Sequence, residues 1–592
     1  MKSSAKHKHI AAAVALLAGA LAGTADARLV RLDITAREVV AGGMAFGDTG
    51  AYEKLTGTAH FEVDPRDEAN RQVFDLEKAP RNRRGRVEFS ADAVILKPID
   101  MKKGNRGLFF EVNNRGNKIA LPMFNDTPPG SNNNNPSAPA DFGNGFLMRQ
   151  GYVVAWVGWG ADIAPGNSRL TVNFPVAAQH GQPITERIVT EYSDRNFGGA
   201  TPFSLPLSGG PNFKSYESVS TDAVVAEAEL RRRPSDSPRP PSAAIPPGEL
   251  VPASEWSFAD CPSGAPGTPS PNHICLAGGF QNNMVYELRY RATRSPVMGL
   301  GYLTSRDFVS FLKESKRDDG GSPNPVQGVD VAYCLGISSS GMYYRDYLYQ
   351  GFNTDERGRR VCDGMHIHIP GVHKLYLNYR FAQPNPFSVQ HRERYVPDAN
   401  FPRRYQQENN PLGGWRGGIL DAEDEDSVAS HDRRHDAGFG SAHGTPWGHA
   451  PASKAARRDG ILDRDDKRTK IIHTDSGTEY WQFRSSLVDT DDHGSTDLRH
   501  PRNVRRYLYA STQHFPTKGA TPNFGTGDRQ CEQLNNVTHP GPMSRALLAA
   551  ASESRGFHDE FTPLRSDQPG VPEPSAWRRY RRSERTGRTH TE

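Results

Sequence analysis

Three adjacent serines stand where an apolar run gives way to a helix-like stretch. Residues 329–349 read VDVAYCLGISSSGMYYRDYLY, the strand, tight turn and helix of a nucleophile elbow. The strained turn needs small residues two positions before and two after the reacting serine. Ser338 meets this requirement with Gly336 and Ser340, whereas the other two serines would place an isoleucine or a methionine in the crowded position. We therefore predict that Ser338 is a nucleophile, and a turn that merely closes a core strand is the alternative.

A serine hydroxyl becomes a good nucleophile when a histidine takes its proton and a carboxylate orients that histidine. After such an elbow, the acid and then the histidine follow along the chain, each just beyond a strand. His514 fits the second position, because it closely follows the last expected strand in YLYASTQHFP. For the acid, KIIHTDSGTEYW offers Glu479 and Asp475. We favour Glu479 for its longer reach, while Asp475, at the strand end, could cap the following turn.

An oxyanion formed on the substrate needs backbone donors near the serine. One is expected from the N–H of Ser339, the residue after the nucleophile, and the other from the loop after the third strand of the core. That loop is the Asn-Asn-Arg-Gly turn that follows GLFFEV. We expect Asn114 or Arg115 to supply the second N–H, although such a turn also forms for purely conformational reasons.

The strand and helix patterns that must position these residues predict an α/β fold. Residues 29–106 alternate in polarity, as antiparallel strands do. The later apolar runs are dense and short, the signature of strands buried on both faces of a parallel sheet. These strands are expected at 107–112, 152–159, 363–371, 469–475 and 507–512, with a helix at 302–314 before the elbow. The pattern favours a mostly parallel sheet flanked by helices, with catalytic loops at the carboxyl ends of its strands.

Several stretches depart from this pattern. Within a domain expected over 28–550, residues 165–285 are rich in Gly, Pro and Ser and are interpreted as a large insertion. Residues 413–465 are crowded with Asp, Arg, His and Gly and are predicted to be a disordered insertion with few buried contacts. The basic end of the chain, 551–592, is likewise expected to be a disordered tail rather than a surface for anionic lipid or polysaccharide.

The first residues resemble a targeting signal. Lysines precede an apolar Ala/Leu segment that ends in Ala25-Asp26-Ala27, the small-x-small pattern of a signal-peptidase site. We predict a signal peptide over 1–27, cleaved after Ala27, and an exported protein that is periplasmic or secreted. The apolar segment is short for a membrane span, so no stable membrane insertion is expected. With 72 basic and 68 acidic residues, the charges nearly cancel, and the sequence gives no reason to expect a nucleic-acid partner.

The five cysteines are too few for a disulfide scaffold in a chain of 592 residues. Export nevertheless permits pairing, and Cys261 and Cys275 flank a Pro/Gly-rich loop that a local disulfide would close. Cys334 lies in the apolar run before the elbow and is expected to be a buried thiol.

Neither the cysteines nor the histidines predict a metal site. No Cys or Cys/His spacing is typical of zinc. The histidines of HIHIPGVH, His366, His368 and His373, could be metal ligands, but Pro370-Gly371 interrupts their alternation and no acidic ligand is suitably spaced. We interpret them as structural, and we expect neither a metal nor an organic cofactor.

A set of longer strings resembles the large exported "alpha/beta hydrolase domain" proteins of bacteria. The strings are GLFFEVNNRGNK, HICLAGGF, YELRYRA, GLGYLTSRDFVSFL, GISSSG, YQGFNTDERGRRVCDGMHIHIPG, LNYRFAQPNPFSVQH, HTDSGTEYW and YASTQHFP. The resemblance runs from about residue 29 to 550 and excludes the signal peptide, the 413–465 tract and the basic tail. The resemblance implies an α/β-hydrolase fold and a serine hydrolase triad. The chain departs from the usual GxSQSGR pattern, because Ser339 and Met342 replace its Gln and Arg.

Together, these patterns predict an exported serine esterase that acts on a small-molecule or polymeric ester. An amidase or peptidase could use the same triad. A binding protein of a different class, which holds a polymer or glycan at a decayed site, is a further alternative, but an intact Ser, acid and His in order argue against it. The sequence leaves the oligomeric state open.

Overall fold

The computed structural model describes residues 28–193, 200–234, 248–375, 377–384, 402–406, 408–409, 416–420, 469–481, 483–491, 494–509 and 514. All of these residues belong to one compact unit, 1–544. The predicted signal peptide, the basic tail and most of the 413–465 tract lie outside the described residues. Among the described residues, no helix is long and apolar enough to cross a membrane.

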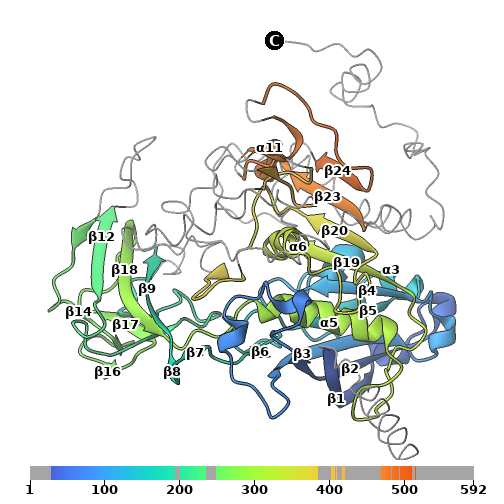
Figure 1. Ribbon diagram of the computed structural model, residues 1–592, viewed down its shortest axis with the longest axis horizontal. Helices are drawn as coiled ribbons and strands as arrows, with labels where there is room; N and C mark the ends of the chain where they lie inside the picture. The colour runs from blue at the N-terminus through green and yellow to red at the C-terminus, as the bar shows by residue number, and fades with distance from the viewer. Residues whose placement is uncertain are drawn as a thin grey trace, which may run out of the picture. The chain divides into compact units, whose positions relative to one another are not determined.

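A ten-stranded sheet carries the main core (Figure 1). Its strands run in the order β1-β2-β3-β5-β4-β19-β20-β23-β24, and β6 pairs with β3 at the side. The antiparallel part comprises β1 (Arg28–Val39), β2 (Tyr52–Val63), β3 (Val87–Pro98) and β6 (Val172–Asn173). The parallel part comprises β4 (Gly107–Val112), β5 (Val153–Val157), β19 (Val331–Ile337), β20 (Gly364–His368), β23 (Lys470–Ser476) and β24 (Val504–Tyr509).

The sheet is therefore mixed, with an antiparallel part largely within the predicted 29–106 region and a parallel part formed by the later strands. Strands β1, β2 and β3 follow one another through direct connections, and such connections produce antiparallel pairs. The antiparallel pairing of β3 with β5 joins the two parts. The dense apolar runs of the sequence coincide with the parallel strands. All six residues of β4 and all five of β5 are buried, as strands covered on both faces must be.

Two longer helices pack on the sheet beside the elbow strand. Helix α5 (Leu300–Glu314) precedes β19, and α6 (Ser339–Tyr349) follows it directly. The two helices touch where the Tyr343 hydroxyl donates to the Gly301 carbonyl at 2.8 Å. The shorter helices are α2 (Ala120–Phe124), α3 (Phe146–Arg149), α10 (Gly477–Trp481) and α11 (Ser486–Asp489).

Much of the Gly/Pro-rich insertion forms structure of its own. One further sheet comprises β9 (Thr185–Tyr192), β11 (Glu217–Ser218), β12 (Glu229–Pro234), β13 (Glu249–Leu250) and β18 (Met284–Thr293). A second comprises β10 (Ser204–Pro206), β14 (Trp256–Ser257) and β17 (His273–Leu276), and two short pairs are β7 (Ala178–Gln179) with β8 (Gln182–Pro183) and β15 (Ala259–Asp260) with β16 (Thr268–Pro269). These sheets enclose a separate apolar cluster, and a disulfide joins Cys261 to Cys275.

One end of the acidic and basic tract is packed. Strand β22 (Arg416–Gly417) pairs with β21 (Glu408–Asn409), and the following Ile419 and Leu420 are buried in the main core. The Ile419 N–H donates to the Arg404 carbonyl at 2.8 Å. The expectation of few buried contacts therefore does not hold for the start of the tract, because an apolar pair inside a polar segment can still reach a core that another segment lines.

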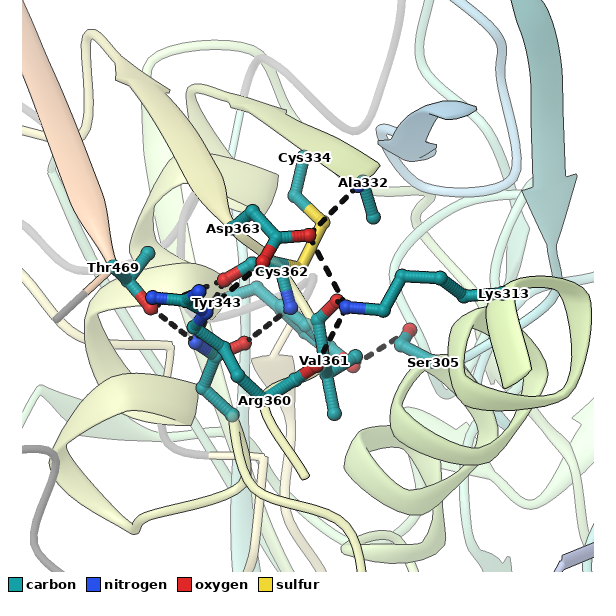
Figure 2. The surroundings of a disulfide bond; sticks show 11 residues. Ser305, Lys313, Ala332, Cys334, Tyr343, Arg360, Val361, Cys362, Asp363 and Thr469 are labelled. Atoms are coloured by element: carbon teal, nitrogen blue, oxygen red, sulfur yellow. Dashed lines mark hydrogen bonds and ion pairs between the residues drawn. A yellow bond between two sulfur atoms is a disulfide. The ribbon is translucent and has the colours of Figure 1, made fainter. Parts of the chain in front are cut away.

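A second disulfide joins Cys334 of β19 to Cys362, just before β20 (Figure 2). Both cysteines are only 1% exposed. The expectation of a free buried thiol at Cys334 is thus wrong. Asp363 reinforces the same place, since its carboxylate accepts from the Ala332 N–H at 2.9 Å and from the Lys313 ammonium at 3.1 Å.

We expect loss of the Cys334–Cys362 bond to lower stability without lowering catalytic turnover. The bond closes a 28-residue separation, for which the chain-entropy model gives about 3.6 kcal/mol. The Cys334→Ala/Cys362→Ala double variant should therefore melt several degrees below wild type, as a thermal melt would measure. The Cys261→Ala/Cys275→Ala variant serves as the matched control with a 14-residue separation. An unchanged melting temperature in the first variant would contradict this expectation.

Candidate active site

Ser338 occupies a strained backbone position between β19 and α6. Its φ of 57° and ψ of −117° are unusual for a residue with a side chain. The turn is held from both sides, because the Ser338 N–H donates to the His368 carbonyl at 2.9 Å and the Met342 N–H donates to the Ser338 carbonyl at 2.9 Å. This geometry is that of a nucleophile elbow, which lifts the serine hydroxyl clear of the strand and helix.

The residues near Ser338 must be small, because other atoms of the turn fill the space that larger side chains would need. A Cβ at Gly336 would lie 2.3 Å from the Ser340 carbonyl oxygen, so no larger residue fits there. A Cβ at Gly341 would lie 2.9 Å from the His368 carbonyl oxygen. The Ser340 hydroxyl is turned inward, within 2.9 Å of both the N–H and the carbonyl oxygen of Ile337. Ser340 therefore closes the turn and does not offer a second exposed hydroxyl.

The structure brings Ser338, His514 and Glu479 together. The Ser338 hydroxyl lies 2.8 Å from Nε2 of His514, and Nδ1 of the same ring contacts Oε1 of Glu479. Glu479 is fully buried in α10, and its other oxygen accepts from the N–H and hydroxyl of Ser476. The Phe483 ring packs on the His514 imidazole with centroids 5.9 Å apart. The imidazole is thus oriented by a carboxylate and an aromatic wall.

Asp475 is buried elsewhere. Its carboxylate accepts from Arg506 Nη2 at 2.7 Å and from the Gly371 N–H at 3.2 Å, and it lies 2.9 Å from Nε2 of His473. Burial alone would raise the pKa of Asp475, but His473 and the Arg506 guanidinium outweigh burial and hold that pKa well below its usual range. The carboxylate is therefore ionised, and its partners are Arg506, Gly371 and His473.

The loop after β4 reaches the elbow in a way that the sequence did not predict. The Asn114 N–H donates to the Asn117 carbonyl at 2.8 Å, so this backbone donor is already used. The Asn114 side chain instead contacts the elbow, with Nδ2 donating to the Ile337 carbonyl at 2.8 Å. Arg115, at a φ of 52°, remains the backbone candidate for the second oxyanion donor beside Ser339.

The three histidines of HIHIPGVH do not share a common partner. His366 and His368 each contact the Thr474 hydroxyl, at 3.0 and 2.7 Å. His373 packs edge-on against Phe483, with ring centroids 5.6 Å apart. Burial lowers the pKa of His366 to about 4 and that of His368 well below its usual value. In the part of the chain that the structure describes, no group of three or more His, Cys, Asp or Glu could hold a metal ion.

Several residues at this site could not be predicted from the sequence. The Asn114 side chain, the His368 carbonyl and Phe483 each contact the elbow or the imidazole. Sequence position offered a signal for Phe483, which lies four residues after Glu479, but none for the His368 carbonyl, which lies 30 residues beyond Ser338. The direction in which each of these groups points could not be deduced, because it depends on how the strands pair.

We expect buried His473 to make the stability of the protein depend on pH. Its ring lies between Asp475 and the Tyr405 hydroxyl, 2.8 Å from Nδ1, and burial lowers its pKa from 6.5 to about 4 despite the opposing effect of Asp475. The unfolded chain therefore takes up the proton first, so the contribution of His473 is full above about pH 6.5 and lost toward pH 4.

The measurement is urea unfolding of wild type and His473→Gln at pH 8, 6 and 5. Below pH 6.5, the unfolding free energy of wild type should fall relative to that of His473→Gln, by up to about 1.4 kcal/mol per pH unit. A difference that stays constant across this range would show that the ring does not stay neutral in the folded protein.

Residues 281–554 match the family model described as "Alpha/beta hydrolase domain". Comparisons with the curated proteins and with the solved structures returned no match. The matched stretch includes the elbow, Glu479 and His514, while β4 and the Asn114 loop precede it. The match confirms the resemblance for those sequence motifs that lie within residues 281–554, and this stretch is similar to the alpha/beta hydrolase domain family.

Proposed function

We propose that this protein is an exported serine hydrolase that cleaves carboxylic esters through an acyl-enzyme. The observation that carries the proposal is the 2.8 Å contact between the Ser338 hydroxyl and Nε2 of His514, whose other nitrogen contacts buried Glu479. Ser338 also has the strained backbone of an elbow serine. A hydroxyl, an imidazole and a carboxylate in this order are the parts of a serine hydrolase triad.

In the proposed reaction, Ser338 Oγ attacks the ester carbonyl carbon as His514 Nε2 takes the hydroxyl proton. The tetrahedral intermediate collapses when the imidazolium returns this proton to the leaving alcohol, which leaves an acyl group on Ser338. Water then attacks the acyl carbon and loses a proton to His514 Nε2. The bond from the acyl carbon to Ser338 Oγ breaks, the imidazolium returns the proton to Oγ, and the carboxylic acid departs. Glu479 holds the imidazole in the tautomer whose Nε2 is free to accept, and its charge stabilises the imidazolium.

The negative charge on the carbonyl oxygen requires fixed donors. We assign the Ser339 N–H to this role, with Arg115 as the second backbone donor. Ser339 is the first residue of α6, where N–H groups have no partner inside the helix, and its side chain is fully buried. Removing one such donor from a serine hydrolase typically costs about 10²- to 10³-fold in turnover.

Export is part of the same proposal. The first 27 residues have the composition of a cleaved leader. Two disulfides, Cys261–Cys275 and Cys334–Cys362, support it, since such bonds form and persist in oxidising compartments. Protein recovered from the periplasm or medium should begin at Arg28 by N-terminal sequencing. Recovery only from the cytosol, with the first 27 residues attached, would contradict export.

Replacing the nucleophile tests the proposal directly. Ser338→Ala should lose about 10⁴-fold or more in turnover of p-nitrophenyl esters and should not react with a fluorophosphonate probe, because the attacking oxygen is gone. Melting temperature should change little, since only one partly buried hydroxyl is removed. Ser340→Ala is the matched control and should keep the label, because Ser340 contacts only the turn backbone. If Ser338→Ala still reacts with the probe, the nucleophile is a residue other than Ser338.

The same assay, run with p-nitroanilides beside p-nitrophenyl esters of different chain length, separates esterase from amidase chemistry. If kcat/KM is higher for the anilides than for the esters, the substrate class is an amide and the proposed triad is unchanged.

The two carboxylates should respond differently to neutralisation. Glu479→Gln removes the charge beside His514, so kcat should fall by about 10²- to 10⁴-fold with little loss of stability. Asp475→Asn leaves buried Arg506 short of a partner and should lower the free energy of unfolding by about 3 kcal/mol, with a smaller effect on kcat. Kinetics on one ester, with thermal melts of both variants, provide the comparison. A larger loss of kcat in Asp475→Asn would assign the triad acid to Asp475.

A further inference from the structure

Asn114 connects two segments that lie far apart in the sequence. Its side chain is only 8% exposed and meets the elbow on both sides of Ser338. On one side, Nδ2 donates to the Ile337 carbonyl at 2.8 Å. On the other, Oδ1 accepts from the Ser339 hydroxyl at 3.0 Å. The orientation of the amide is fixed chemically, because the Ile337 carbonyl can only accept and must face the nitrogen.

The loop that presents Asn114 is itself anchored at several points. The Asn113 side chain donates to the Val157 carbonyl at 2.7 Å and accepts from the Gly116 N–H at 2.8 Å. Buried Glu111 of β4 accepts from the N–H groups of Ile119 and Ala120 at 2.7 and 2.8 Å. The loop is therefore held to β5 and to its own strand, so a contact made by Asn114 transmits a fixed position to the elbow.

We propose that Asn114 is a positioning residue that holds the two oxyanion-binding segments, the elbow and the loop after β4, at a fixed separation. This inference rests on the proposed serine hydrolase function. By contacting the residues on either side of Ser338, the amide fixes the orientation of the Ser339 peptide, whose N–H must point at the carbonyl oxygen when the charge develops. A donor displaced by a fraction of an ångström stabilises that charge less, because such sites depend on preorganisation.

Three variants separate the two contacts. Asn114→Ala removes both. Asn114→Asp keeps an acceptor for the Ser339 hydroxyl but places an oxygen against the Ile337 carbonyl. Ser339→Ala removes only the hydroxyl and keeps the backbone N–H. We expect kcat for p-nitrophenyl acetate to fall about 10- to 100-fold in both Asn114 variants and by less than about 10-fold in Ser339→Ala. These losses are smaller than the loss of turnover expected when an oxyanion donor is removed altogether.

The expected signature is a change in kcat with little change in KM. The pH at which kcat/KM reaches half its maximum should stay at the wild-type value, because the His514 and Glu479 contacts are untouched. The double variant Asn114→Ala/Ser339→Ala should be no slower than Asn114→Ala, since the Ser339 hydroxyl has by then lost its partner. Additive losses would show that the two residues act separately and would overturn the proposal.

Asn353 provides a matched control for general loss of stability. It is 2% exposed and also bridges two segments: Oδ1 accepts from the Cys362 N–H at 2.9 Å, and Nδ2 donates to the Thr469 hydroxyl at 2.6 Å. Asn353→Ala should lower the melting temperature and leave kcat unchanged. An equal loss of kcat in Asn353→Ala, or normal kcat in a folded Asn114→Ala, would overturn the positioning role.

Two further outcomes are decisive. If Asn114→Ala does not fold, the kinetics of Asn114→Asp and Ser339→Ala decide, and normal kcat in both would overturn the proposal. Wild-type protein is measured in the same assay. If it neither turns over esters or anilides nor takes the fluorophosphonate label, the proposed function fails and the positioning role fails with it, whereas active wild type beside equally active variants removes only the positioning role.

Discussion

A serine with a positive φ is unfavourable, and the turn at Ser338 exists only because its surroundings compensate for that cost. Strained backbone of this kind typically costs about 1–3 kcal/mol. Here the His368 carbonyl takes the Ser338 N–H, the Ser340 hydroxyl binds back to Ile337, and the absence of a side chain at Gly336 leaves room for the Ser340 carbonyl. These contacts hold the turn in place, and the Ser338 hydroxyl lies 2.8 Å from Nε2 of His514.

Two buried carboxylates four residues apart have different surroundings because they belong to different elements. Asp475 lies inside β23, whose register places it against Arg506 and His473. Glu479 lies in α10, beyond the strand, where its side chain can turn back toward the His514 ring. The ion pair of Asp475 therefore stabilises the strands beneath the site, and the carboxylate of Glu479 is left for the imidazole. One short segment, HTDSGTEYW, thus supplies both a structural and a proposed catalytic acid.

The features that could be predicted from the sequence are those that local rules determine. The elbow follows from Gly336 and Ser340 in a fixed spacing, and β4 coincides with a dense apolar run. Pairing of distant segments could not be predicted in this way. The Cys334–Cys362 bond depends on β19 lying beside β20, and no spacing within the sequence encodes that neighbour.

The same limit explains the side chains that were misjudged. Local turn chemistry suggested a backbone role for Asn114, but where its side chain points depends on the β4–β19 ladder. Burial of Ile419 and Leu420 depends on a segment around Arg404 that the composition of their own tract does not reveal.

The parallel ladders also explain how residues separated by more than a hundred positions meet. Ile337 pairs with His368 in the β19–β20 ladder, and His368 pairs with Thr474 in the β20–β23 ladder. These two registers set where Ser338 and Glu479 emerge, and a slip of one residue in either would turn every side chain to the opposite face. The first ladder is tied at both ends, by the Cys334–Cys362 bond and by the Ser338 to His368 hydrogen bond. Cys334 lies about 13 Å from the elbow along the strand. The covalent bond therefore fixes the register from a distance at which it takes no part in the chemistry.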